Sequence, residues 1–180
     1  MNYLNINDKH LLAVNQDLNQ LLSDYSVYYQ KLRSFHWNVL GKNFFDLHEK
    51  FEELYTDARI KIDEIAERIL TLRYHPLSKM SEYLKISKLE EVSAMITDEE
   101  MVHEILGDHK KILAQMKATM ETAENAKDEG TLDMIGAYIA ELEKASWMLD
   151  AWARSTKEQL ESIKMGRSSL FGETYPTNLK

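Results

Sequence analysis

Apolar residues that return every three or four positions are the feature that most limits how this chain can fold. They run from Leu11 through Leu18, Leu22 and Tyr25 to Leu32, a spacing that places them on one face of an α-helix. Only two prolines and six glycines interrupt the 180 residues, and both residue types disfavour helix interiors. The sequence therefore predicts an all-α fold of long helices, with enough chain for one core.

Breaks in this pattern divide the chain into four long helices and a tail. Asn7 suits the N-cap of the first helix, Pro76 stops the second because the residue before a proline avoids the α region, and Thr97 with Glu100 forms a capping box that opens the third. The helices are expected over residues 7–39, 44–73, 97–125 and 131–163. Residues 77–95 connect the middle pair through one or two short helical pieces, and residues 164–180 form a loose tail.

Two short turns and one long middle connection are typical of a ferritin-like four-helix bundle. We predict such a bundle over about residues 7–163, with a short extra helix in the long crossover, within a single domain of residues 1–180. An elongated coiled coil is the alternative. It needs a sustained seven-residue repeat, and the apolar spacing here is broader than a two-position seam.

The charge and composition of the chain exclude several classes of function. A formal net charge of −8 opposes contact with nucleic-acid phosphates unless a basic patch is kept apart from the acidic remainder. The absence of cysteine excludes disulfides and thiolate metal ligands. No apolar run reaches the roughly 18 residues that cross a bilayer, so no membrane association is expected. The opening MNYLNINDKH lacks the apolar core of a signal peptide, and a cytoplasmic location is expected.

Two histidines flank the break between the first two helices. His36 ends the first helix and His48 lies one turn into the second, so a tight antiparallel hairpin brings the imidazoles toward each other. The second helix also carries Glu52, Asp63 and Glu67. His48 and Asp63 are separated by about 22 Å along one helix, so they cannot hold the same metal within one chain.

A second copy of the chain can bring the two groups of ligands together. If two copies pack antiparallel about a two-fold axis, the His36 and His48 end of each meets the Asp63 and Glu67 end of the other, and two identical sites result. Imidazole and carboxylate ligands without thiolate suit iron, manganese or zinc, and open positions suit ferrous iron in particular.

The spacing of these residues also has ordinary explanations. Carboxylates four residues apart are common on solvated helix faces, and a histidine at a turn can simply bond a backbone carbonyl. Glu100 and His103 form the Glu-x-x-His of di-iron bundles, but those proteins need the motif on two helices and only one copy occurs here. His103 is therefore expected to be a polar or interface residue.

The segment HWNVLGKNFFDLHEKFEELYTDARIKIDEIAERI, residues 36–69, resembles the signature of the Dps family, the mini-ferritins known as DNA-binding proteins from starved cells. The resemblance implies a hollow dodecamer of ferritin-like subunits that oxidises ferrous iron, preferentially with hydrogen peroxide, and stores the ferric mineral. It also implies a ferroxidase centre between two-fold-related subunits. A non-enzymatic DNA-compacting shell and a pilus-like or adhesive use of the same assembly are the alternatives.

Carried over residue by residue, the resemblance assigns His36 and His48 as ligands from one subunit and Asp63 and Glu67 as ligands from its neighbour. Position 52 is commonly Asp in the family, whereas this chain has Glu52. The side chain is one methylene longer and is expected either to bind the metal or to orient a water or an imidazole beside it.

Two tryptophans also match the family pattern. Trp37 corresponds to the tryptophan beside the centre and is expected to be an electron donor to the oxidant. Trp147 corresponds to one on the last helix, where packing in the core or an interface is the expected role.

The resemblance further implies an acidic pore near the turn into the last helix. Glu124 and Asp133 are the candidate pore residues in this stretch, and acidic walls would concentrate ferrous ions. An Asp near a helix start is, however, also favoured by the helix dipole alone.

Binding to DNA is expected to be weak or absent. Family members that grip DNA use a tail rich in Lys and Arg, whereas only Lys9 precedes the first helix here. The C-terminal tail carries Lys164, Arg167 and Lys180 against Glu173. This small excess, repeated over many subunits, is compatible only with salt-sensitive association with the nucleoid.

Overall fold

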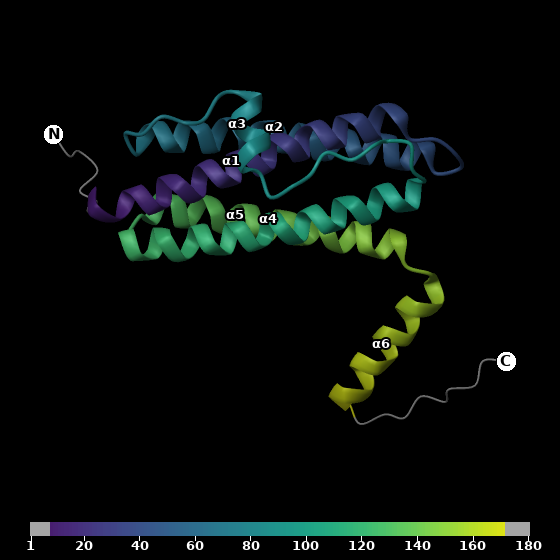
Figure 1. The fold of residues 1–180 in the computed structure, drawn as a ribbon. Coiled ribbons are helices and arrows are strands. Elements are labelled where there is room, and N and C mark those ends of the chain that lie inside the picture. The colour runs from purple at the N-terminus through teal and green to yellow at the C-terminus, as the bar shows by residue number, and fades with distance from the viewer. Residues whose placement is uncertain (1–7, 172–180) are drawn as a thin grey trace.

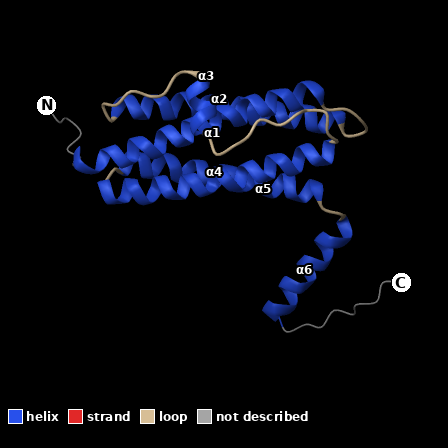
Figure 2. Cartoon of the chain, in the orientation of Figure 1, coloured by secondary structure: helices blue, strands red, loops and turns tan. Residues whose placement is uncertain are grey.

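Four long helices packed side by side make up most of the structure. The computed structural model describes residues 8–171, which form helices and connecting segments without a strand (Figures 1 and 2). The helices are α1 (Asp8–Asn38), α2 (Phe44–Thr71), α3 (Met80–Ile86), α4 (Asp98–Ala126), α5 (Glu129–Ala153) and α6 (Thr156–Phe171). The predicted all-α bundle is confirmed, and α3 is the short extra helix in the long crossover.

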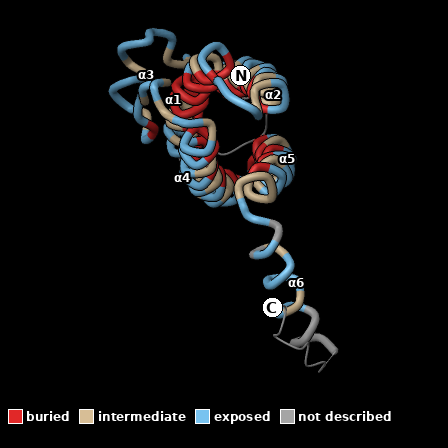
Figure 3. The backbone as a smooth tube through the Cα atoms, turned by 90° about the vertical axis from the view of Figure 1, so that its right-hand side faces the viewer, coloured by how far each residue is buried: buried red, intermediate tan, exposed pale blue. Residues whose placement is uncertain are grey.

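The apolar stripe of α1 lies at the centre of the bundle. Figure 3 looks along the helices and shows the buried residues of α1, α2, α4 and α5 turned toward one another. Phe35 of α1 and Phe51 of α2 are fully buried with ring centroids 6.0 Å apart. Burying each such side chain contributes roughly 1.5–3 kcal/mol, so this packing fixes how α2 lies against α1.

The α1–α2 connection is a tight turn. Residues 39–43 reverse the chain, and Gly41 does so with a φ of +100°, which a side chain would make unfavourable. The backbone N–H of Val39 donates to the carbonyl of Phe35 at 2.8 Å, and that of Phe44 donates to the carbonyl of Gly41 at 3.2 Å. The turn therefore holds the end of α1 beside the beginning of α2.

The prediction of one continuous fourth helix to Ile163 is wrong. Helix α5 ends at Ala153, Arg154 is extended with ψ of 145°, and α6 turns away from the bundle (Figure 1). The side-chain amide of Gln159 donates to the carbonyls of Ala151 and Arg154, which replaces the backbone bonds of a continued helix. The predicted loose tail is also wrong over residues 164–171, which belong to α6, while Asn7, Glu173 and Lys180 lie outside the described residues.

Buried polar contacts join α1 to α4 and α5. Lys31 of α1 and Asp108 of α4 form an ion pair of 2.7 Å with both side chains 3% exposed. The hydroxyl of Tyr28 lies 2.6 Å from Nε2 of His109, and Nδ1 of the same ring lies 2.8 Å from Oγ of Ser146 on α5. Such satisfied groups favour one arrangement of the three helices.

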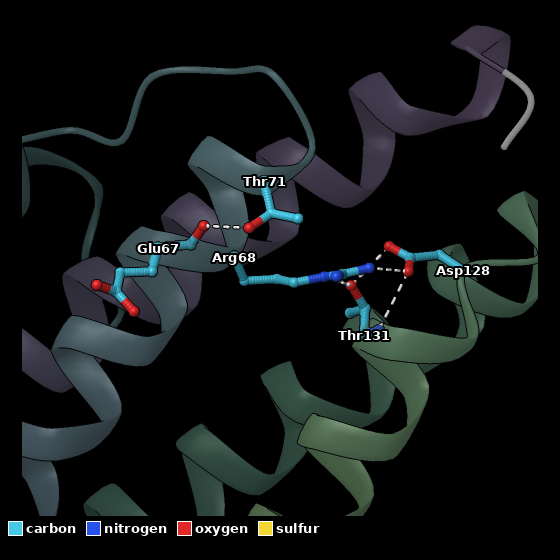
Figure 4. Close-up of polar contacts among 5 residues, drawn as sticks. All are labelled: Glu67, Arg68, Thr71, Asp128 and Thr131. Atoms are coloured by element: carbon cyan, nitrogen blue, oxygen red, sulfur yellow. Dashed lines mark hydrogen bonds and ion pairs between the residues drawn. The ribbon is translucent and has the colours of Figure 1, made fainter. Parts of the chain in front are cut away.

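The side of α2 that faces α5 is polar. Arg68 donates to Asp128, the N-cap residue of α5, and its Nε donates to Oγ1 of Thr131 at 3.0 Å (Figure 4). One helical turn before Arg68, Glu64 accepts a hydrogen bond from the hydroxyl of Tyr138. One further turn toward the N-terminus of α2, the ammonium of Lys61 contacts the carboxylate of Glu141 at 2.8 Å. These links fix the rotation of α2 about its axis.

Removing the Arg68 side chain should destabilise the protein markedly. Asp128 is fully buried, so Arg68→Ala leaves a buried carboxylate without its cation and should lower the free energy of unfolding by about 3 kcal/mol. Lys79→Ala is the control, because Lys79 and Glu82 form an exposed pair of 3.7 Å whose loss should cost less than about 0.5 kcal/mol. Urea unfolding measures both, and equal effects would contradict the structural importance of the Arg68 contact.

His109 should make the stability depend on pH. Burial lowers the pKa of His109 from 6.5 to about 3, so below pH 6.5 the unfolded chain takes up a proton that the folded chain refuses. Above pH 6.5 the titration of His109 does not change the free energy of unfolding. As the pH falls from 6.5 toward 4, the free energy of unfolding should decrease by up to about 1.4 kcal/mol per pH unit.

The matched variant for this test is His109→Gln, which keeps hydrogen-bonding groups but does not titrate. Urea unfolding at one protein concentration from pH 7 to pH 4 should show a shallower pH dependence in the variant. Asp108 is present in both proteins, so its own titration cancels in the comparison. Identical slopes would show that His109 is not held neutral by the fold.

Candidate metal centre

The two histidines at the α1–α2 turn form a crossed pair. Their rings stack with centroids 3.8 Å apart and planes at 21°. Nδ1 of His36 bonds the carbonyl oxygen of His48 at 2.8 Å, and Nδ1 of His48 bonds the carbonyl oxygen of His36 at 2.9 Å. A carbonyl oxygen can only accept, so each Nδ1 carries the proton and each neutral ring has its free lone pair on Nε2. This is the tautomer that a metal ligand requires.

Aromatic side chains hold the histidine pair in place. The ring of Phe44 stacks on His48 with centroids 4.9 Å apart, and the edge of Tyr55 meets His36 at 5.3 Å. The hydroxyl of Tyr55 donates to Oε1 of Glu52 at 3.1 Å. Tyr55 therefore links Glu52 to the histidine pair.

Trp37 lies at the edge of the histidine pair and is 58% exposed. The guanidinium of Arg33 lies 4.7 Å from the centroid of the Trp37 ring and 5.3 Å from that of Tyr29. This stacking orders an aromatic residue that would otherwise be free in solvent.

The remaining two candidate ligands lie far from the histidines. Asp63 and Glu67 are on the exposed face of α2, about 22 Å and about 28 Å along the helix from His48. In Figure 4 the Glu67 carboxylate points away from the contact that Arg68 makes with Asp128. Within residues 8–171 no group of three or more His, Cys, Asp or Glu side chains is arranged to hold a metal. One chain therefore presents two separate halves of the expected site.

Large apolar side chains accompany these carboxylates. Phe45, Ile60 and Leu70 are all exposed on α2, with Phe45 81% exposed. A shallow depression on the same helix is lined by Thr56, Ile60 and four carboxylates, those of Glu49, Glu52, Glu53 and Asp57. Exposed apolar residues among charged ones are typical of a surface that another protein molecule covers.

The alternative motif, Glu100 and His103, is not arranged as a metal site. The Glu100 carboxylate accepts from the backbone N–H of Thr97 at 2.7 Å, and this backbone bond lowers the pKa of Glu100. Nδ1 of His103 bonds the carbonyl of Glu99 at 2.7 Å. Glu100 is thus used by the capping of α4, and His103 bonds a carbonyl of the first turn of the same helix.

The candidate pore residues lie on either side of the α4–α5 turn. Glu124, near the end of α4, and Asp133, in the second turn of α5, are both exposed. Asp128 between them is buried and caps α5, accepting from the backbone N–H of Thr131 at 3.1 Å. The turn therefore leaves Glu124 and Asp133 free to face solvent or another subunit.

Tyr55 and the Tyr28–His109 pair were missed by the sequence reasoning. Tyr55 follows His48 by seven residues, which is two helical turns, so spacing could have indicated that it shares a face with the histidine. Tyr28 and His109 are 81 residues apart, and no local pattern connects them.

Comparison with known proteins gives the same fold and a family. A model of the ferritin-like domain matches residues 15–158. DNA protection during starvation protein 2 of Bacillus anthracis is 48% identical over 135 residues, which are 75% of this chain and 92% of the relative. The corresponding protein of Brevibacillus brevis is 42% identical over 75% of this chain and 91% of the relative.

Solved structures agree. The crystal structure of a Dps protein from Vibrio cholerae O1, described as a member of a broad superfamily of ferritin-like diiron-carboxylate proteins, superposes with a TM-score of 0.82 at 40% identity, covering 86% of this chain and 97% of that one. Dps from Staphylococcus aureus gives a TM-score of 0.77 at 38% identity, covering 79% and 95%. By the matched domain, the sequence identity and the shared fold, this chain belongs to the Dps family of ferritin-like proteins.

Proposed function

We propose that this protein is a ferroxidase and iron store. It oxidises ferrous iron with hydrogen peroxide, or with dioxygen, and keeps the ferric mineral inside a hollow homo-oligomer, which for this family is expected to be a dodecamer. The crossed histidine pair carries the proposal, because its bonds occupy both Nδ1 atoms and leave both Nε2 atoms available to an ion. Removing ferrous iron and peroxide together prevents hydroxyl-radical formation and so limits oxidative damage.

Each site is completed by a second copy of the chain. His36 and His48 hold the ferrous ion, and Asp63 and Glu67 of a two-fold-related subunit supply the carboxylates. The exposed apolar residues on the same face of α2 support this pairing, since they would be covered by it. The remaining coordination positions are left for the oxidant.

Neighbouring groups would assist the reaction. Glu52, held by Tyr55, orients water or a ligand at the centre. Trp37, next to His36 in the chain, can give an electron to the oxidant. Glu124 and Asp133 would draw ferrous ions toward an entry pore.

The rival function is a DNA-compacting shell in which the metal site is structural. The names of the relatives refer to DNA protection during starvation, and protection can be achieved by removing iron and peroxide without contact with DNA. The net charge of −8 disfavours tight DNA binding, so we expect it to be weak or absent. No helix among residues 8–171 is long and apolar enough to cross a membrane, and we propose a cytoplasmic location.

Replacing both histidines should abolish fast ferrous oxidation. His36→Ala/His48→Ala removes the nitrogen ligands, and the initial rate of ferric absorbance after mixing with ferrous iron and peroxide should fall more than about tenfold. The control is His103→Ala, because His103 is exposed and bonds the carbonyl of Glu99 on its own helix. A rate equal to that of the parent in the double variant would favour the DNA-compacting shell.

Mixed assembly tests whether the site is shared between two chains. His36→Ala/His48→Ala chains and Asp63→Asn/Glu67→Gln chains should each be inactive alone. Refolded together in equal amounts, they should recover about a quarter of the sites, because each intact site needs histidines from one chain type and carboxylates from the other. Absence of any recovery in assembled mixtures would place all ligands on one subunit.

A further inference from the structure

Two neighbouring tyrosines of α1 lie in the core but differ at their hydroxyl groups. Tyr25 and Tyr28 are both fully buried, and their ring centroids are 6.1 Å apart. The Tyr25 hydroxyl has no hydrogen-bond partner among the described residues. The Tyr28 hydroxyl lies 2.6 Å from Nε2 of His109. Only Tyr28 therefore has a base in contact with its phenolic proton.

The direction of this hydrogen bond follows from the groups behind the histidine. Ser146 donates its only hydroxyl proton to the carbonyl of Leu142 at 2.7 Å, so its oxygen must accept from Nδ1 of His109 at 2.8 Å. Nδ1 is then protonated and Nε2 is the acceptor for the Tyr28 O–H. Burial raises the pKa of Tyr28 and lowers that of His109 to about 3, so at neutral pH the pair is a phenol bonded to a neutral imidazole.

Aromatic rings extend from the histidine pair to Tyr29, the residue that follows Tyr28 in α1. The edge of Tyr55 meets His36 at 5.3 Å, and the ring of Tyr29 meets that of Tyr55 at 6.1 Å. Tyr29 directly follows Tyr28 in α1 and lies one helical turn from Tyr25. Tyr28 and His36 are eight residues apart on α1, so the electron has about 12 Å to cross along the helix between the candidate metal centre and Tyr28.

We propose that Tyr28 and His109 form a proton-coupled electron donor that supplies the second electron when peroxide meets a centre holding one ferrous ion. The inference rests on the proposed function only for the source of the oxidant. Peroxide takes one electron from the ferrous ion, one electron from Tyr28 and two protons from solvent, and becomes two waters. The phenolic O–H bond breaks, its proton binds Nε2 of His109, and a neutral phenoxyl radical beside an imidazolium remains.

A second ferrous ion restores the pair. It gives one electron to the phenoxyl radical and becomes ferric, and the proton returns from His109 to the Tyr28 oxygen. Two ferrous ions are then oxidised per peroxide although the centre binds them one at a time. No hydroxyl radical is released between the two steps.

The hydrogen bond explains why Tyr28 would react rather than Tyr25, its buried neighbour in α1. An oxidised phenol is strongly acidic, and transfer of its proton to His109 avoids a cation on the ring in the low-dielectric core. Tyr25 has no acceptor, so its oxidation would leave a buried charge uncompensated. Trp37 is 58% exposed, so an electron vacancy there would be open to reductants and water.

The first experiment needs no iron. The apoprotein is oxidised by flash-photolysed ruthenium tris-bipyridine with persulfate, and the tyrosyl radical is measured by freeze-quench electron paramagnetic resonance. Tyr28→Phe should reduce the long-lived radical at least about fivefold, whereas the matched variant Tyr25→Phe should retain it, since only Tyr28 has a base. An undiminished radical in Tyr28→Phe, or a loss confined to Tyr25→Phe, would overturn the inference.

A measurement on the parent protein alone tests the inference even if the variants misfold. With ¹⁵N-labelled histidine, the radical should show coupling to an imidazole nitrogen, and an uncoupled tyrosyl radical would rule out the Tyr28–His109 pair. With iron, at one ferrous ion per centre, the parent should reduce about one peroxide per ferrous ion without releasing hydroxyl radical. Tyr28→Phe lacks the second electron and should release hydroxyl radical, which spin trapping measures. If the parent does not oxidise ferrous iron, the proposed function fails, while the apoprotein result still decides the role of Tyr28.

Discussion

The rise of an α-helix decides where this protein can bind a metal. His48 and Asp63 are both on α2, whose length holds them about 22 Å apart, and no rearrangement of loops in one chain can shorten that distance. His36 and His48 are twelve residues apart in the sequence, but the α1–α2 turn brings them together, because Gly41 allows the chain to reverse and the two rings to stack. In the proposed centre, one chain therefore supplies a pair of imidazoles and a second chain supplies the pair of carboxylates.

The three faces of α2 contact different surroundings. The apolar face, with Phe51 and Ile65, packs on the bundle core. The face toward α5 carries Lys61 and Arg68, which contact Glu141 and Asp128. Because these contacts fix the rotation of the helix, the third face is held outward, and that is the face with the acidic candidates. The stability of the bundle and the exposure of the proposed metal ligands thus depend on the same residues.

The sequence predicted the parts of this structure that depend on local pattern. Apolar spacing indicated the four bundle helices, and the Gly41 break with its flanking histidines indicated the hairpin that pairs them. The end of α5 was missed because it depends on Gln159, whose side chain bonds backbone carbonyls that a continuous helix would use. The Tyr28–His109 contact was missed because it joins distant positions of α1 and α4. The separation of the two halves of the centre was derived correctly from helix geometry, whereas the crossed bonds that fix the histidine tautomers needed coordinates.

The interior of the bundle explains why the surface is where metal chemistry belongs. Ferritin-like di-iron proteins hold their metals inside each bundle, with inward Glu and His side chains from all four helices. Here the ammonium of Lys61 already lies between Asp57 and Glu141, close to the ring of Tyr138. A resident cation neutralises those carboxylates and removes the negative charge that a metal ion would need. The carboxylates that Lys61 neutralises are half exposed, Asp57 at 49% and Glu141 at 62%, so this charge balance lies at the rim of the bundle. In the proposed centre, Asp63 and Glu67 on the exposed face of α2 act when a second chain brings its histidines to them.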